Sequence, residues 1–257
     1  MSDLVLQEDP APGVRLLRIN RPEARNALNT PLRKSLAEAF AKASQEPDLR
    51  AVVLTGDEHA FVAGADLREF ATMSTAEVAR IDMRETWGVI AACPLPIIAA
   101  IRGFALGGGL ELAMHADIII AGEGAKLGQP EINVGIMPGG GGTQRLVRAL
   151  GKFKAMKMLL TGQPVSGREA FEMGLVSEVV EDAEVLPRAI EMATRIASLP
   201  PLSARRIKEV VLAGADAPMD TAIMLERRAF ETLFDTADKA EGMAAFLEKR
   251  PARFKGE

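Results

Sequence analysis

Two carboxylates and three glycine-rich segments are the parts of this sequence best suited to chemistry. Glu111 lies in Gly-Gly-Gly-Leu-Glu-Leu-Ala-Met and Glu131 in Leu-Gly-Gln-Pro-Glu-Ile-Asn, each among small and apolar neighbours. A carboxylate in such surroundings tends to have a raised pKa, which suits general acid and base work near neutral pH. The alternatives are a first-turn helix residue for Glu111 and an ordinary loop acid for Glu131. Their occurrence together favours catalysis.

The glycine-rich segments could present main-chain amides to a ligand. They cover residues 59–67, 103–111 and 138–143. The first two follow apolar, strand-like runs, and the last two precede predicted helices. Small residues let the backbone approach a ligand, and free N–H groups at a helix N-terminus can hold a phosphate or a developing oxyanion. The alternative is that these glycines only make tight turns.

Other catalytic patterns are not supported. No segment matches a P-loop, and the Gly-x-Gly-x-x-Gly spacing that begins at Gly107 fails because its last position is Leu112. We expect Cys93 to lie in the core, His115 to be packed and His59 to be exposed. There is no G-x-S-x-G nucleophile turn. One cysteine and two histidines without zinc spacings predict no metal site and no redox cofactor.

Alternating strands and helices must position these groups. Near-continuous apolar runs predict strands that are covered on both faces, at residues 14–19, 51–55, 96–101 and 118–120. Thr30 with Pro31 predicts a helix start, with Thr30 as N-cap. Ser74 and Glu77 form a capping-box pattern for a helix that would run towards Cys93. A further helix is predicted over 110–115, so the first part of the chain has an α/β pattern.

The pattern becomes helical only from about Asp182 onward. We therefore predict an α/β core domain over residues 1–196 and a C-terminal helical region over 197–257. The helical region carries apolar residues among charged ones, namely Met224, Phe230, Leu233 and Phe234. These side chains either pack on the core of the same chain or form a subunit interface.

Composition excludes several classes of protein. The 257 residues are 48% hydrophobic and 26% charged, as in an ordinary globular protein. The net charge of −4 gives no overall attraction to nucleic acid or to anionic lipid. No uncharged apolar run approaches the roughly 18 residues of a membrane span, and the N-terminus lacks a signal pattern. We expect a soluble, cytoplasmic protein that binds neither nucleic acid nor membranes.

Taken together, the motifs resemble the crotonase superfamily, and the enoyl-CoA hydratases in particular. The likeness covers nearly the whole chain, with matching stretches at 20–22, 26–29, 61–67, 105–113, 128–132, 135–138, 141–146, 174–176 (with Ala170), 241–243 and 246–250. This resemblance implies an α/β fold made of a spiral of ββα turns. It also implies a C-terminal helical trimerisation region, a homotrimer or a dimer of trimers, and an acyl-CoA thioester as substrate.

The resemblance implies a role for each candidate site residue. The main-chain N–H groups of Ala65 and Gly108 would form the oxyanion hole for the thioester oxygen. Glu111 and Glu131 would hold one water, with Glu111 removing its proton and Glu131 delivering a proton to Cα. The presence of both glutamates favours the hydration of a trans-2-enoyl-CoA to a 3-hydroxyacyl-CoA. No cofactor is implied, since coenzyme A is part of the substrate.

The same resemblance implies contacts with CoA and with the acyl chain. The CoA contacts would be Ala24, Arg25, Ala63, Asp66 and Leu67, together with Phe246 and Lys249 from the last helix, often of a neighbouring subunit. For Arg25 and Lys249 the alternative is a solvated surface charge. Candidates for lining the acyl site are Met73, Met83 and Trp87. The chain is also similar to the dehydroadipyl-CoA hydratases of aromatic-acid degradation, including its ending Phe254-Lys255-Gly256.

Three other functions are also compatible with the sequence. An enoyl-CoA isomerase of the same fold would use chiefly Glu131. Some crotonase relatives bind AU-rich RNA through a lysine-rich helix, but the matching segment 32–42 has only three bases and an acid among them. The third is a non-catalytic acyl-CoA-binding protein. A substrate panel and substitution of Glu111 would separate these functions.

Overall fold

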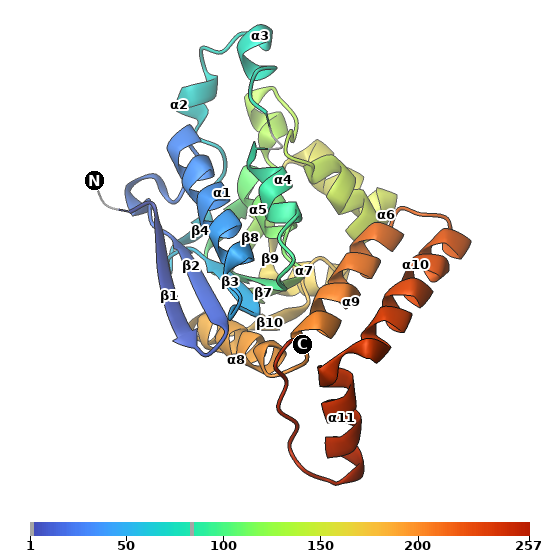
Figure 1. Cartoon of the computed structure of the whole chain (residues 1–257). Coiled ribbons are helices and arrows are strands. Elements are labelled where there is room, and N and C mark those ends of the chain that lie inside the picture. Colours follow the sequence, from blue (N-terminus) through green and yellow to red (C-terminus); the bar gives the residue numbers. More distant parts are fainter. Residues whose placement is uncertain (1–2, 83–84) are drawn as a thin grey trace.

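A six-stranded sheet forms the base of the fold in the part of the chain that the computed structural model describes, residues 3–82 and 85–257 (Figure 1). Its strands, in spatial order, are β1 (Val5–Ala11), β2 (Val14–Ile19), β3 (Ala51–Thr55), β5 (Ile97–Ile101), β7 (Ile118–Gly122) and β10 (Glu178–Val180). β1 and β2 form an antiparallel hairpin, and the other neighbours pair in parallel.

A smaller sheet of four strands, counted over the same described residues, lies beside the first. In spatial order its strands are β4 (Ala60–Val62), β6 (Phe104–Leu106), β8 (Lys126–Gly128) and β9 (Val165–Ser166). A strand of the large sheet, a strand of the small sheet and a helix follow one another repeatedly. The helices that close these units are α2 (Leu67–Phe70), α5 (Gly108–Ala113) and α6 (Gly142–Thr161). This ββα succession is the spiral that the resemblance implied.

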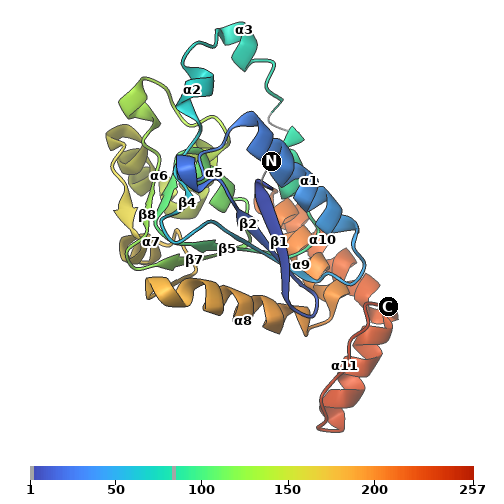
Figure 2. The same cartoon turned by 90° about the vertical axis from the view of Figure 1, so that its left-hand side faces the viewer.

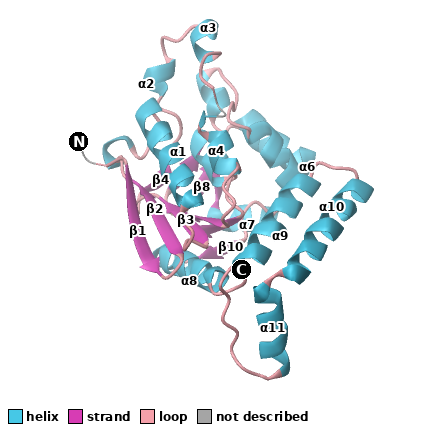
Figure 3. Ribbon diagram, viewed as in Figure 1, coloured by secondary structure: helices cyan, strands magenta, loops and turns pink. Residues whose placement is uncertain are grey.

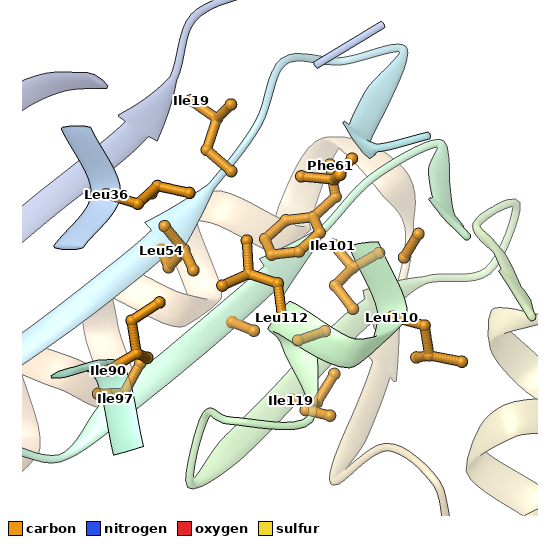
Figure 4. Close-up of a cluster of buried hydrophobic side chains, with 14 of the residues drawn as sticks. Ile19, Leu36, Leu54, Phe61, Ile90, Ile97, Ile101, Leu110, Leu112 and Ile119 are labelled. Atoms are coloured by element: carbon orange, nitrogen blue, oxygen red, sulfur yellow. The ribbon is translucent and has the colours of Figure 1, made fainter. Parts of the chain in front are cut away.

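The central strands β3 and β5 are buried at every position, and apolar except at Thr55, because both faces of the large sheet are covered. Alternate residues point to opposite faces of a strand, so Leu54 and Ile97 enter one core while Val53 and Ile98 enter another. The first core lies between the two sheets, with α1 (Thr30–Gln45) and α4 (Trp87–Ala91) packed on it (Figure 4). The second core lies between the large sheet and α8 (Val185–Ala197), which runs along the lower face of the sheet in Figure 2.

The start of α1 differs from the prediction by one residue. Asn29, rather than Thr30, is the N-cap, because its backbone is extended and its side chain accepts a hydrogen bond from the Leu32 N–H. Asn is as favourable an N-cap as Ser or Thr. Thr30 is already helical, and its hydroxyl is bonded to Arg33 and Glu69 instead.

The predicted helix from Ser74 towards Cys93 is wrong in its length. The capping box of Ser74 and Glu77 is present, but α3 (Thr75–Val78) makes a single turn and the next helix, α4, begins at Trp87. Residues 75–80 are all exposed, so no packed face stabilises further turns. The Met83 prediction falls outside the described residues.

Only helices follow β10, as the pattern from Asp182 predicted (Figure 3). These are η4 (Asp182–Glu184), α8, α9 (Pro201–Gly214), α10 (Met219–Thr232), η5 (Leu233–Asp235) and α11 (Ala237–Leu247); the remaining elements are η1 (Pro22–Ala24), η3 (Glu131–Val134) and α7 (Gly167–Met173). The division between residues 196 and 197 stays a prediction. No helix of the described residues is both long and apolar enough to cross a bilayer.

The helical tail, α9 to α11, contributes no side chain to either hydrophobic core of its own chain. Every residue of α9 and α10 is at least partly exposed, and Met224, Phe230 and Phe234 are each more than two-fifths exposed. Phe230 and Phe234 contact each other edge to face, and Leu233 is half-buried. Of the two alternatives for these residues, packing on the chain's own core is therefore not supported for Met224, Phe230 and Phe234. Figures 1 and 2 show α10 and α11 extending away from the sheets.

Candidate active site

Two main-chain amides meet where the chain leaves the parallel strands β4 and β6. Ala65 follows β4 and forms a bridge with Leu28, and Gly108 begins α5 just after β6. The Ala65 nitrogen lies only 3.7 Å from the position that a Cβ on Gly108 would occupy. Neither N–H donates to a residue within the described chain. The pair can therefore donate to one external oxygen, as an oxyanion hole requires.

Gly107 is required by the geometry of this turn. Its φ of 52° is unfavourable for any residue with a Cβ, and it orients the following amide at the start of α5. A Cβ at Gly107 would lie 2.8 Å from Oε1 of Glu131. The second glycine-rich segment therefore lets the Glu131 carboxyl approach the amide pair.

Glu111 is buried in the first turn of α5 and is held by the third glycine-rich segment. Its Oε1 accepts hydrogen bonds from the Gly140 and Gly142 N–H groups, both at 2.7 Å. Burial raises the pKa of Glu111, while these two N–H groups and the Arg145 charge oppose the rise. The amides of Gly140 and Gly142 thus bind this carboxylate, not an external phosphate or oxyanion. The Glu111 Oε2 lies 2.7 Å from the position of a Cβ on Gly140 and 4.0 Å from that of a Cβ on Gly108.

Glu131 begins η3, and its carboxyl group lies next to Gly107, the residue before the Gly108 amide. In the orientation that satisfies its amide, the buried Gln129 donates to both carboxylate oxygens, at 2.9 and 3.1 Å. Partial burial raises the pKa of Glu131 to about 7, and the negative charge of Glu111 adds to the rise. The two carboxyl groups are therefore close enough to interact, and they differ in surroundings.

The buried rings of His115 and Trp87 stack next to the helical turn that carries Glu111. His115 Nδ1 lies 2.8 Å from the Glu111 carbonyl oxygen, to which it donates, and the His115 ring stacks on Trp87 with centroids 5.2 Å apart. Burial lowers the pKa of His115 to about 4, with a smaller effect from Arg145, so the ring is neutral at pH 7. The predictions of a packed His115, a core Cys93 and an exposed His59 are all confirmed.

Part of the predicted CoA site comes together next to the amides. The Ala63 N–H donates to the Arg25 carbonyl at 3.1 Å, which joins the segment of Ala24 and Arg25 to the strand end before Ala65. The Arg25 guanidinium is exposed and lies over the Phe104 ring. This charge is available to a phosphate.

Asp66 and Leu67 lie at the same edge but have different neighbours. The Asp66 carboxylate forms an ion pair with Arg21 at 2.8 Å and also caps α2. Its negative charge is therefore already paired within the chain. The Arg21 hydrogen bond lowers the pKa of Asp66. Leu67 is about half exposed and presents an apolar side chain to solvent. Only Leu67 of this pair offers a free side chain to a ligand.

Phe246 and Lys249 are not brought to this site within one chain. Phe246 is 83% exposed near the end of α11, and Lys249 lies just beyond that helix. Figures 1 and 2 show α11 at the end of the molecule opposite α2, which begins at Leu67. Of the acyl-site candidates, Met73 is half-buried and Trp87 is buried.

Two supporting residues were missed by sequence reasoning. Gln129 orients Glu131, and Arg145 places a half-buried positive charge near Glu111. A polar residue two positions before Glu131, between glycine and proline, was the available signal for Gln129. No side-chain cluster in the described chain has the His, Cys, Asp or Glu groups to hold a metal ion.

Comparison with known proteins decides the family. Residues 10–257 match the profile described as enoyl-CoA hydratase/isomerase. The chain belongs to this family. A probable enoyl-CoA hydratase of Mycobacterium bovis is 43% identical over 251 residues, which are 98% of this chain and 97% of that protein. The 2,3-dehydroadipyl-CoA hydratase of Escherichia coli K12 is 40% identical over 256 residues, with both chains fully covered (100%).

Solved structures of the enoyl-CoA hydratase/isomerase family have the same fold. An enoyl-CoA hydratase from Bacillus anthracis superposes with a TM-score of 0.95 at 39% identity, covering 99% of this chain and 100% of that one. A second structure, from Geobacillus kaustophilus, gives a TM-score of 0.96 at 38% identity, with both chains fully covered (100%). The predicted family and α/β fold are confirmed, and the chain is an enzyme of this family. Trimerisation and the roles of individual residues stay predictions.

Proposed function

We propose that this enzyme hydrates trans-2-enoyl-CoA thioesters to 3-hydroxyacyl-CoA. The supporting observation is that the two carboxyl groups border adjacent glycines next to the free amides of Ala65 and Gly108. Glu131 borders Gly107, and Glu111 borders Gly108. A family isomerase needs only one carboxylate to move a proton along the acyl chain. Two carboxyl groups in different electrostatic surroundings suit the addition of water, which takes one proton from oxygen and adds one to carbon.

The amide pair activates the substrate. Its two N–H groups donate to the thioester oxygen, which makes Cβ electrophilic and then holds the negative charge of the enolate. Removal of one such donor typically costs about 3 kcal/mol of transition-state stabilisation. Ala65 and Gly108 are small, so their side chains leave the approach to the carbonyl open.

The two glutamates then divide the proton transfers. Burial raises the pKa of Glu111, but the Gly140 and Gly142 N–H groups and Arg145 oppose this rise and stabilise the carboxylate, so we assign Glu111 as the base. Glu131, with a pKa of about 7, carries a proton for much of the time at neutral pH and acts as the acid. The water oxygen bonds to Cβ, its proton passes to Glu111, and Glu131 protonates Cα. Return of the proton from Glu111 to Glu131 restores the enzyme, so the net change is the addition of one water.

Loss of the conjugated-thioester absorbance of crotonyl-CoA tests this function directly. We expect rapid loss with the unmodified enzyme and almost none with Glu111→Gln. An isomerase would leave the signal largely unchanged on crotonyl-CoA, and a non-catalytic binding protein would leave it unchanged with both proteins. A panel of short, medium, branched and dicarboxylic enoyl-CoAs would then identify the acyl group, including 2,3-dehydroadipyl-CoA.

We further propose a homotrimer or a dimer of trimers that covers the exposed apolar side chains of the tail. In such an assembly Phe246 and Lys249 would reach the CoA of a neighbouring subunit. Coenzyme A would be part of the substrate, and the enzyme would need no separate cofactor. A cytoplasmic location stays a prediction.

RNA binding finds little support at α1. Of the three bases in segment 32–42, Arg33 is buried and bonded to the Leu28 carbonyl and to Glu69. Lys34 and Lys42 are left as the basic side chains of this segment. Two separate lysines make a weak electrostatic site for a phosphate backbone.

A further inference from the structure

Trp87 carries the one buried polar atom of the candidate site for which the structure provides no acceptor. Its side chain is 7% exposed, and none of the described residues accepts a hydrogen bond from its Nε1–H. A buried donor without an acceptor is unfavourable, so such a group in a site calls for a ligand or water. The remaining contacts of Trp87 fix the plane of its ring.

This ring is held in place relative to Glu111. Trp87 begins α4 and stacks on His115 with an angle of 16° between the rings. His115 is bonded in turn to the main-chain oxygen of Glu111, four residues earlier. The neutral imidazole thus connects the indole to the turn of α5 that carries the carboxylate.

The indole N–H and the free oxygen of Glu111 flank one point. The position of a Cβ on Gly140 lies 3.0 Å from Trp87 Nε1 and 2.7 Å from Glu111 Oε2. The two atoms are therefore at most about 5.7 Å apart, a distance that one oxygen bridges with two hydrogen bonds of ordinary length. Gly140 and Gly142 occupy the other carboxylate oxygen, Oε1, so Oε2 is the one left for the reaction.

We propose that the indole N–H of Trp87 donates a hydrogen bond to the oxygen that adds to Cβ. This inference rests on the proposed hydration. A water held between the two glutamates donates one hydrogen to the Glu111 carboxylate and the other to the unprotonated oxygen of the Glu131 carboxyl, and one of its lone pairs attacks Cβ. The other lone pair needs a donor that cannot accept, and an indole N–H is such a group. In the product the same N–H donates to the 3-hydroxyl oxygen.

The composition of the chain permits a test that removes this N–H alone. Trp87 is the only tryptophan. Expression in a tryptophan auxotroph supplied with 3-benzothienylalanine therefore replaces one N–H by sulfur and leaves the shape of the ring nearly unchanged. Incorporation of 5-fluorotryptophan, which keeps the N–H, is the matched control. Trp87→Phe provides a genetically encoded second variant.

We expect the benzothienyl protein to lose roughly tenfold in kcat, as for one neutral hydrogen bond made to the reacting atom. The loss should be similar for hydration of crotonyl-CoA and for dehydration of 3-hydroxybutyryl-CoA. Inhibition by butyryl-CoA, which has no oxygen at C3, should be unchanged, and the fluorotryptophan protein, which keeps the N–H, should lose much less kcat than the benzothienyl protein. Unchanged butyryl-CoA inhibition also shows that the site is folded.

Two results would overturn the inference while leaving the hydration intact. The first is an unchanged kcat in the benzothienyl protein. The second is an equal loss of kcat and of butyryl-CoA affinity, which would mean that Trp87 only shapes the acyl site. Inactivity of the unmodified enzyme on every enoyl-CoA would instead overturn the proposed function itself.

Discussion

The glutamate site and the helical tail differ in whether their side chains find partners within the chain. At the site, hydrogen bonds from Gly140, Gly142 and Gln129 hold the two carboxyl groups, and all the donors come from the same chain. In the tail, α9 and α10 leave apolar side chains such as Ile223 and Phe230 about half exposed. The hydrogen bonds that hold the two glutamates are thus all made within one chain, whereas the tail has an apolar surface that its own chain does not cover.

This difference separates two kinds of experimental effect. Changes at the site should alter kcat, because its groups meet the reacting atoms and are held by contacts within the chain. Changes in the tail should alter assembly and, through Phe246 and Lys249 of a neighbour, the KM for the CoA substrate. A substitution at the site that alters assembly, or one in the tail that alters kcat, would contradict this assignment.

The largest expected effect is that of Glu111→Gln. The amide oxygen of Gln can still accept from Gly140 and Gly142, so the fold is retained while the base is lost. We expect kcat to fall by roughly 10³-fold. Measurement of crotonyl-CoA absorbance checks this, with Glu123→Gln, an exposed glutamate paired with Arg168, as the control of unchanged activity. A loss below tenfold would show that Glu111 is not the base.

Gln129→Met should have a smaller effect on kcat. Met keeps a similar volume but cannot donate to the Glu131 carboxylate, so the carboxyl group loses its orientation. We expect kcat to fall roughly 30-fold and the pKa of Glu131 to rise, since a donor that favours the charged form is gone. The pH dependence of kcat/KM measures both changes. An unchanged profile would mean that Gln129 only fills space.

The pH dependence of the unmodified enzyme should report the acid of the site. Burial raises the pKa of Glu131 to about 7, so its proton is retained below that pH and lost above it. Hydration kcat/KM should therefore be level just below pH 7 and should fall above it towards about tenfold per pH unit. The interaction with Glu111 makes this an apparent value of the pair. A rate that rises through pH 7 would assign Glu131 as a base.

The smallest expected effect on turnover comes from the tail. Ile223 and Phe230 are seven residues apart, so they share a face of α10, and their joint replacement by Glu places two charges on the proposed interface. We expect dissociation in sedimentation velocity, a KM for crotonyl-CoA raised by roughly fivefold, and kcat within about twofold. Thr221→Glu on the opposite face of α10 is the control. Dissociation without a change of KM would exclude Phe246 and Lys249 as contacts of the neighbour's CoA.

Much of the fold could be predicted because its determinants are local. The near-continuous apolar runs at 51–55 and 96–101 predicted strands covered on both faces, and Ser74 with Glu77 predicted the start of α3. The error at Thr30 was also local, since Asn29 is an equally good cap. The end of α3 could not be predicted in this way, because a pattern does not reveal whether a surface exists for a helix to pack on.

The sequence by itself determined the residue types, the turn at Gly107, the order of strands and helices and the family. Only the tertiary structure decided how they are used: that the third glycine-rich segment holds Glu111, that Gln129 directs Glu131, and that the tail stays exposed. The reason is the distance along the chain. Gly142 and Glu111 are 31 residues apart, and no periodicity links a donor and an acceptor across such a separation. Their contact exists only after the intervening strands and turns have packed.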